Sequence, residues 1–206
     1  MAHAFHRSFR RAFMLLGLAC AGAWGCGTEA GQHRPGQTTE EASEPLSDGQ
    51  ILAVVATIDQ GEITNAETAR IRATNDSVRN FAEHMDAAHR ENETRIQGLQ
   101  AKLRVKQEGS EMQSNLRRQA ERTAEVLRTT PANKFDVAYL DAQIAMHQRA
   151  ITLFDAQLIP NAESTDLQTF LRDLRPSLVQ HLGQARQLRN RFPAPTGNEI
   201  PSRRGR

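Results

Sequence analysis

Apolar residues recur at alternating steps of three and four through most of the chain, a pattern that predicts amphipathic helices packed together. Between Asn133 and Ile159 the apolar positions are Val137, Leu140, Ile144, His147, Ile151, Phe154 and Leu158. His147 therefore stands where a leucine is expected. A position on this seam is removed from water, so its imidazole must find a polar partner or remain unsatisfied.

Four further helices are predicted from the same periodicity, over about residues 48–74, 76–103, 111–128 and 165–192. Ser47 with Gln50 forms a capping box before the first, Asn75 caps the second and Ser164 caps the last. Pro176 predicts a kink in the last helix because it removes one backbone donor. Alternating runs of β-branched residues are absent, so we expect an all-α protein.

The long helices form two hairpins, and residues 75–81 match residues 164–170 in cap, first core residue and aromatic anchor. The shorter helix between them has about eighteen residues and climbs about 27 Å at about 1.5 Å per residue. That is the length of a bundle. We therefore predict a four-helix bundle with a long crossover containing a shorter extra helix, and with the second and third long helices parallel.

Each long helix carries one polar residue on or beside its seam, and these are Glu62, His89, His147 and His181. In the predicted topology all four lie about 16 to 21 Å from the same end of the bundle. They are therefore candidate ligands for one mid-bundle metal ion. The metal site is the alternative prediction. The first is a structural core histidine, with His147 bonded to Glu62 or another polar seam residue and fixing the register of the helices, in a non-catalytic envelope protein with a binding or stress-related role.

The types of the candidate ligands do not select one metal ion. Imidazole and carboxylate suit zinc, whereas Met85 and Met146 near two histidines suit copper. A ferritin-type iron site requires two Glu-x-x-His pairs, and only Asp86-x-x-His89 approaches that pattern. An iron oxidase centre is therefore not favoured, and the single ion of the metal-binding prediction is zinc, copper or iron. No serine elbow or glycine-rich phosphate loop is present either, so the sequence does not predict an enzyme.

The chain resembles an exported bacterial family known as domain of unknown function 4142. The resemblance covers about residues 48–191, and its motifs are Gln60-Gly61-Glu62-Ile63, Val78-Arg79-Asn80-Phe81-Ala82, Met85 with His89, Tyr139-Leu140-Asp141-Ala142-Gln143, His147 and Phe154. It implies a ferritin-like four-helix bundle behind an export signal, and it implies no established activity. The family usually has Asp before each of two histidines, whereas this chain has Ala88 and Met146.

Residues 1–25 are predicted to be a secretory signal, because Arg7, Arg10 and Arg11 precede a short apolar stretch. The stretch resembles a lipoprotein signal, with Cys26 as the lipidated residue and Cys20 as the alternative. Simple cleavage without lipidation is the other possibility. Lipidation would anchor the protein in a membrane, and we expect the outer membrane, facing the periplasm, because no Asp follows Cys26.

Residues 26–46 are predicted to be a disordered linker, residues 47–192 the folded domain and residues 193–206 a disordered basic tail. Removing residues 1–25 leaves 23 basic and 24 acidic residues, a formal charge of −1, which argues against nucleic-acid binding. His84 lies off the seam and His33 lies in the linker, so neither is given a role. Asp136, Asp141 and Arg149 are assigned to solvated faces. The sequence indicates no particular protein partner.

Overall fold

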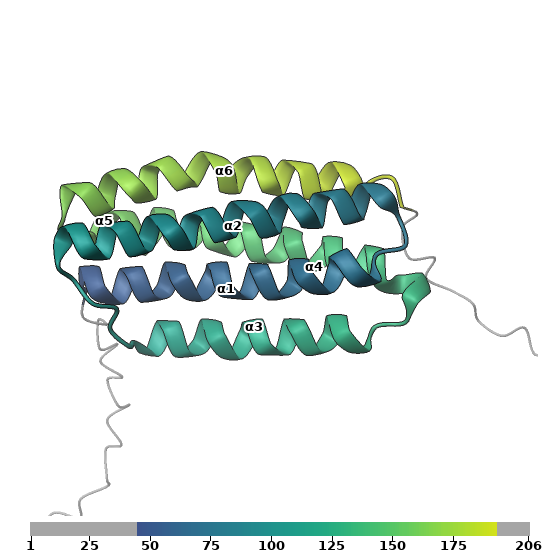
Figure 1. The fold of residues 1–206 in the computed structure, drawn as a ribbon, viewed down its shortest axis with the longest axis horizontal. Coiled ribbons are helices and arrows are strands. Elements are labelled where there is room, and N and C mark those ends of the chain that lie inside the picture. Colours follow the sequence, from purple (N-terminus) through teal and green to yellow (C-terminus); the bar gives the residue numbers. More distant parts are fainter. Residues whose placement is uncertain (1–44, 193–206) are drawn as a thin grey trace, which may run out of the picture. The chain divides into compact units, whose positions relative to one another are not determined.

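The computed structural model describes residues 45–192, where all regular structure is helical. Its elements are α1 (Asp48–Arg72), α2 (Asp76–Leu103), α3 (Glu111–Thr129), α4 (Ala132–Leu153), the π-helical η1 (Phe154–Leu158), α5 (Ile159–Asn161) and α6 (Thr165–Arg189) (Figure 1). The predicted signal segment, the predicted linker up to residue 44 and the basic tail lie outside these residues. Leu46, at the end of the predicted linker, is partly buried and packs against the bundle core, so the folded part begins before residue 47.

The helix starts are those that the sequence predicts. Ser47 and Gln50 form the reciprocal capping box of α1, the Asn75 side chain accepts from the first turn of α2, and Ser164 caps α6. α6 is one continuous helix through Pro176. α4 continues into π-helical η1, next to Pro160, which has no N–H to donate to the preceding turn.

Two aspartates at opposite ends of the bundle join the two hairpins. The Asp136 carboxylate at the start of α4 accepts hydrogen bonds from the backbone N–H of Thr74 and Asn75, between α1 and α2. At the other end, Asp48 at the start of α1 accepts from the backbone N–H of Glu163 and Ser164. α2 and α4 therefore start at one end, α1 and α6 at the other. The parallel arrangement of the second and third long helices is confirmed.

The crossover helix α3 lies outside the four long helices and packs along α1 (Figure 1). The contact is close at Gly61, where an added Cβ would lie 3.0 Å from the Cβ of Ala120. At the end of α3, Leu127 is buried and the Arg72 guanidinium donates to the Leu127, Arg128 and Thr130 carbonyls. The fold is thus a ferritin-like four-helix bundle with a long crossover containing a shorter extra helix.

A polar layer divides the bundle core into two apolar parts. One part includes Ile51, Leu52, Ile96, Phe154, Leu158, Leu167 and Leu171. The other part includes Val78, Phe81, Met85, Leu127, Phe135, Tyr139 and Leu140. The buried polar side chains of the layer between them are Asp59, Glu62, Asn65, His89, Gln143, His147 and His181. Polar side chains at such a level must satisfy one another or hold a ligand.

Three details of the sequence prediction are wrong. The apolar stripe expected on the first helix includes Ile58, but Ile58 is only partly buried and lines a cavity with Leu116 and Ala120 of α3, whereas Asp59 is buried against His89 and Asn92 of α2. On α4 the buried residues include Tyr139 and Gln143, whereas Ile144 is only partly buried. Asp136 is buried and accepts hydrogen bonds from Thr74 and Asn75, although it was assigned to a solvated face.

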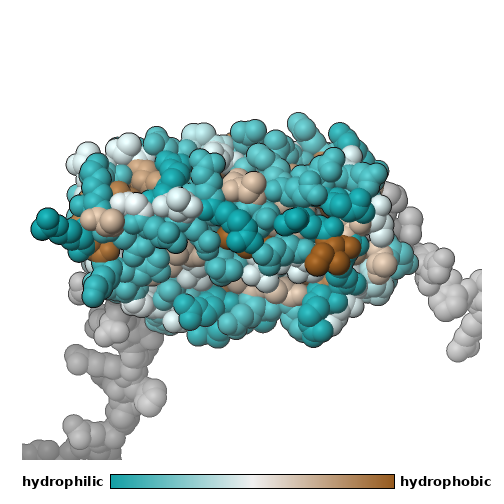
Figure 2. All heavy atoms as spheres, viewed as in Figure 1, coloured by the Kyte–Doolittle hydropathy of each residue, from teal (hydrophilic) through white to brown (hydrophobic). Residues whose placement is uncertain are grey.

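The surface of the bundle is mostly hydrophilic on the face drawn in Figure 2. The large apolar residues that are exposed among residues 45–192 are Ile71, Val126 and Val179. Within this same range no helix combines the length and the hydropathy of a membrane span. The drawn face therefore offers isolated apolar residues rather than an extended apolar surface.

Candidate metal centre

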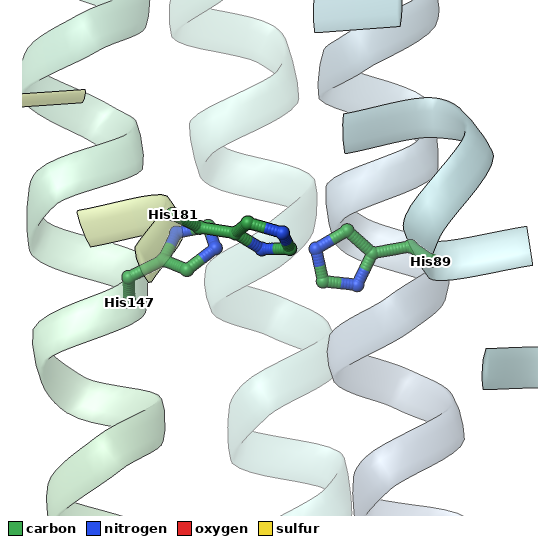
Figure 3. A group of neighbouring side chains, drawn as sticks. All are labelled: His89, His147 and His181. Carbon is green, nitrogen blue, oxygen red and sulfur yellow. The ribbon is translucent and has the colours of Figure 1, made fainter. Parts of the chain in front are cut away.

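Three histidines from three different helices meet in the polar layer. His89 comes from α2, His147 from α4 and His181 from α6, and Figure 3 shows their rings pointing toward one another. Their side chains are buried, with 1%, 1% and 5% of the residue surface exposed. One ring nitrogen from each histidine lies within 4.8 Å of the corresponding nitrogens of the other two.

The His89 ring is oriented by Asp59 on α1. Its Nδ1 lies 2.6 Å from Asp59 Oδ1, which also accepts from the Asn92 side chain. Burial disfavours the charged imidazole, but the hydrogen bond to Asp59 and the charge of Glu62 outweigh burial and raise the pKa of His89. Because Nδ1 is the donor in this bond, Nε2 is the nitrogen that can bind a metal ion in place of a proton.

The His147 ring is oriented by the backbone of its own helix. Its Nδ1 lies 2.9 Å from the Gln143 carbonyl oxygen and 3.4 Å from Oε1 of Glu62. The other oxygen of Glu62 accepts from the Gln143 side-chain amide at 2.6 Å. Burial lowers the pKa of His147, and the nearby Glu62 opposes this only partly. His147 is therefore held as a neutral imidazole with Nε2 facing away from these partners.

His181 differs from the other two histidines because neither ring nitrogen has a hydrogen-bond partner among the described residues. Burial, together with the positive charges that His147, His89 and His84 can carry, lowers its pKa to about 3. Its ring centroid lies 5.4 Å from that of His147 and 5.8 Å from that of His89. His181 is thus a neutral, weakly fixed imidazole beside two well-oriented ones.

Three buried ring nitrogens have no partner in the described part of the chain: His89 Nε2, His147 Nε2 and His181 Nδ1. Three atoms separated by at most 4.8 Å all lie within about 2.8 Å of one point, which is 4.8 Å divided by √3. Ordinary zinc–imidazole bonds are about 2.0 to 2.1 Å long. A shift of less than about 1 Å in each ring would therefore bring all three nitrogens to bonding distance of one ion.

The charges around the three histidines also suit a cation. Asp59 and Glu62 are 2% and 1% exposed, and each lies against one of the rings. Buried carboxylates are costly unless a positive charge is close to them. A carboxylate or carbonyl behind a metal-bound imidazole is also the usual arrangement around metal ions in proteins, because it fixes the ring and increases its basicity.

The structure brings together three of the four predicted ligands. His89, His147 and His181 share one level of the bundle, as the depth count from the sequence requires. Glu62 lies at the same level but beside Nδ1 of His147, on the side of the ring that carries the hydrogen bond to Gln143. Glu62 therefore lies behind the His147 ring, as Asp59 lies behind the His89 ring.

Other side chains considered from the sequence lie elsewhere. The Met146 sulfur lies 3.3 Å from the side-chain amide of Asn65, between α1 and α4. Asp86 pairs with Arg70 and Arg90 at the surface, so no Asp86-x-x-His89 ligand pair forms. Neither a ferritin-type carboxylate pair nor a copper-binding thioether from Met146 therefore joins the three histidines.

Asp59 and Gln143 are not among the site residues predicted from the sequence, although both fall at helical spacing from other buried residues. Val55, Asp59, Glu62 and Ala66 follow steps of four, three and four, and Tyr139, Gln143 and His147 follow steps of four. Ile58 and Ile144 made the neighbouring stripes look more apolar. Hydropathy therefore favoured Ile58 and Ile144 over the neighbouring polar residues Asp59 and Gln143, which are the buried ones.

Comparisons with known proteins agree with this fold. The family model described as "Domain of unknown function (DUF4142)" matches residues 32–188. The solved structure titled "Crystal structure of DUF305 fragment from Deinococcus radiodurans" is similar with a TM-score of 0.60 and 14% identity, and the match covers 72% of this chain and 99% of that chain. At that identity the likeness concerns the fold alone. No curated protein matches the sequence.

Proposed function

This chain belongs to the family described as "Domain of unknown function (DUF4142)", and we propose that it binds one divalent transition-metal ion, zinc or copper, through His89, His147 and His181. One observation carries the proposal: three buried histidines each bring one ring nitrogen within 4.8 Å of the other two, and each ring has a buried nitrogen without a hydrogen-bond partner among the described residues. Two of these rings are held from behind by Asp59 and by the Gln143 carbonyl. A metal ion there would satisfy all three nitrogens at once.

The proposed role is storage or buffering of the ion rather than catalysis. The histidines are at most 5% exposed, so a substrate has little access to a bound ion. Zinc and copper(II) both accept three imidazoles with one remaining position for water. Iron held as in ferritin would need carboxylates among the ligands themselves, and in the described residues Asp59 and Glu62 stand behind the rings instead.

The alternative function is a purely structural polar layer. It is favoured by two buried hydrogen bonds that need no metal, Asp59 with His89 and Gln143 with Glu62. Such layers can fix the register of helices at a cost in stability. This alternative leaves the three converging nitrogens unsatisfied, or bound to a buried water molecule.

Calorimetric titration of the metal-free protein separates the two functions. With Zn²⁺ or Cu²⁺ we expect one ion per chain and a Kd below about 1 µM, because three imidazoles close around the ion. His147→Leu should weaken this binding at least about 100-fold, since it removes one ligand of three. Unchanged affinity in His147→Leu, or no binding tighter than micromolar in the wild type, would leave the structural function.

The same titration tests the carboxylate behind His89. Asp59→Asn keeps the side-chain shape and should weaken binding by about 10- to 100-fold. Asp155→Asn is the matched control, because Asp155 is a surface carboxylate paired with Arg175 in the neighbouring helix α6. Equal affinities for the two variants would contradict a role for Asp59 in holding the metal ligand.

Export and lipid anchoring belong to the same proposal and rest on the sequence of residues 1–26 alone. Three arginines, a short apolar stretch and Cys26 support an exported protein attached to the cell envelope. Intact-mass analysis of the mature protein should give an N-terminal Cys26 carrying a diacylglycerol group, and Cys26→Ala should lack it. A mature N-terminus without lipid would instead indicate a cleaved, soluble export form.

A further inference from the structure

His84 and His181 lie next to each other, although His84 is exposed and His181 is buried. Their ring centroids are 5.4 Å apart and their planes are nearly perpendicular, at 87°. His181 in turn lies within 5.8 Å, centroid to centroid, of both His89 and His147. The four imidazoles thus form a continuous series from the surface of the bundle to its polar layer.

A surface hollow between α2 and α6 gives access to this series. It is shallow and open to solvent, has a volume of about 290 Å³, and is lined by Asn80, Phe81, His84, Gln184, Gln187, Leu188 and Arg191. Gln184 Oε1 is buried there and has no partner among the described residues. Gln184 lies about one turn after His181 on α6, and the His84 imidazole in the lining of the hollow is in ring contact with the candidate ligand His181.

His181 is also the ligand best able to move. Asp59 holds His89 and the Gln143 carbonyl holds His147, whereas the ring of His181 has no such bond. It is the least buried of the three histidines, at 5% exposed. A ring that breaks no hydrogen bond when it turns can exchange partners at low cost.

From the hollow, the series of rings and the free His181 ring, we infer that the metal ion enters and leaves the bundle between α2 and α6. His84 is the first protein ligand, and His181 passes the ion from His84 to His89 and His147. In this step a hydrated ion exchanges water for His84 and then for the buried nitrogens, with no change in oxidation state. The inference rests on the proposed metal-binding function and assigns the route by which that site is loaded.

Arg191 provides a direct test of the route, because its positive charge lines the same hollow and should repel an incoming cation. Removing that charge should speed uptake of the ion, which is an effect that general damage to the fold does not produce. Arg172, exposed on the same helix α6 and not part of the hollow, gives a matched change of charge.

The experiment measures Zn²⁺ uptake by stopped flow and Zn²⁺ release to an excess of chelator, using the full chain. We expect His84→Ala to slow both rates by about tenfold with little change in Kd, because a transient ligand lowers the barrier in both directions. Arg191→Gln should speed uptake by about threefold at low ionic strength, and salt should reduce the gain. Arg172→Gln should match the wild type.

Unchanged rates in His84→Ala would overturn the route, and so would a weaker Kd with an unchanged uptake rate, which would make His84 an equilibrium ligand. Equal effects of Arg191→Gln and Arg172→Gln would also overturn it. Tight binding of Zn²⁺ with any of these results would leave the proposed function standing. Absence of Zn²⁺ binding in the wild type would contradict the metal-binding function and the entry route together. Failure of the route alone can therefore be told apart from failure of the proposed function.

Discussion

Zinc is expected to raise the melting temperature of the metal-free protein by about 8 to 16 °C when free zinc is about 1,000 times the Kd. At that excess, binding to the folded state alone contributes about 4 kcal/mol, and each kcal/mol shifts a domain of this size by about 2 to 4 °C. The ions bind the folded state preferentially because His89, His147 and His181 meet only after α2, α4 and α6 have packed. Thermal unfolding followed by circular dichroism measures the shift.

Substitution of a histidine ligand should remove the stabilisation by zinc without lowering the stability of the metal-free protein. His181→Leu removes a buried imidazole without a hydrogen bond, so the metal-free variant should be as stable as the wild type or more stable by about 1 to 2 kcal/mol. Its melting temperature should nevertheless hardly respond to zinc. His84→Ala is the control, which should retain the full shift at equilibrium. A zinc shift of the same size in His181→Leu would locate the bound ion elsewhere on the chain.

Asp136→Ala is expected to lower the free energy of unfolding by about 3 kcal/mol, the largest effect we predict for a polar residue away from the histidines. The carboxylate accepts from Thr74 N, Asn75 N and Thr74 Oγ1, at 3.0, 3.0 and 2.5 Å. Asp136 is only 6% exposed, so alanine would remove a buried charged acceptor of three hydrogen bonds from the junction of the two hairpins. Urea denaturation at neutral pH measures the loss.

Asp48 at the opposite end of the bundle is the matched control. It accepts from Glu163 N and Ser164 N but is partly exposed, so water can replace its carboxylate and Asp48→Ala should cost only about 1 kcal/mol. Equal losses for the two variants would show that burial does not set the strength of these contacts. Both aspartates tie one hairpin to the turn of the other, which fixes how far the hairpins slide along each other and hence the common level of the histidines.

The helices and their starts could be predicted because they depend on residues close together in the sequence. The capping box of Ser47 with Gln50 and the caps at Asn75 and Ser164 are interactions over two or three residues. The level of the histidines could be predicted because a helix rises by a constant amount per residue, about 1.5 Å. Depth along a bundle is therefore a matter of counting once the topology is known.

Which side of a helix is buried could not be derived in the same way. Asp59 is enclosed because α2 brings His89 and Asn92 against it, although it interrupts an apolar stripe. Asp136 looks like a surface charge until the turn at Thr74 is placed against it. Both residues are polar, and hydropathy assigns polar residues to solvent unless a partner from another helix is known.

The sequence by itself determined an all-α chain, the hairpins and crossover, and the shared level of His89, His147 and His181, because each follows from local hydrogen bonding and helical periodicity. Only the tertiary structure decided that Asp59 holds the His89 ring, that Glu62 lies beside Nδ1 of His147, and that His84 adjoins His181. These contacts join residues on different helices, whereas the bond from His147 to the Gln143 carbonyl lies within α4. Their geometry depends on helix rotation and packing, which no count of positions along a single helix contains.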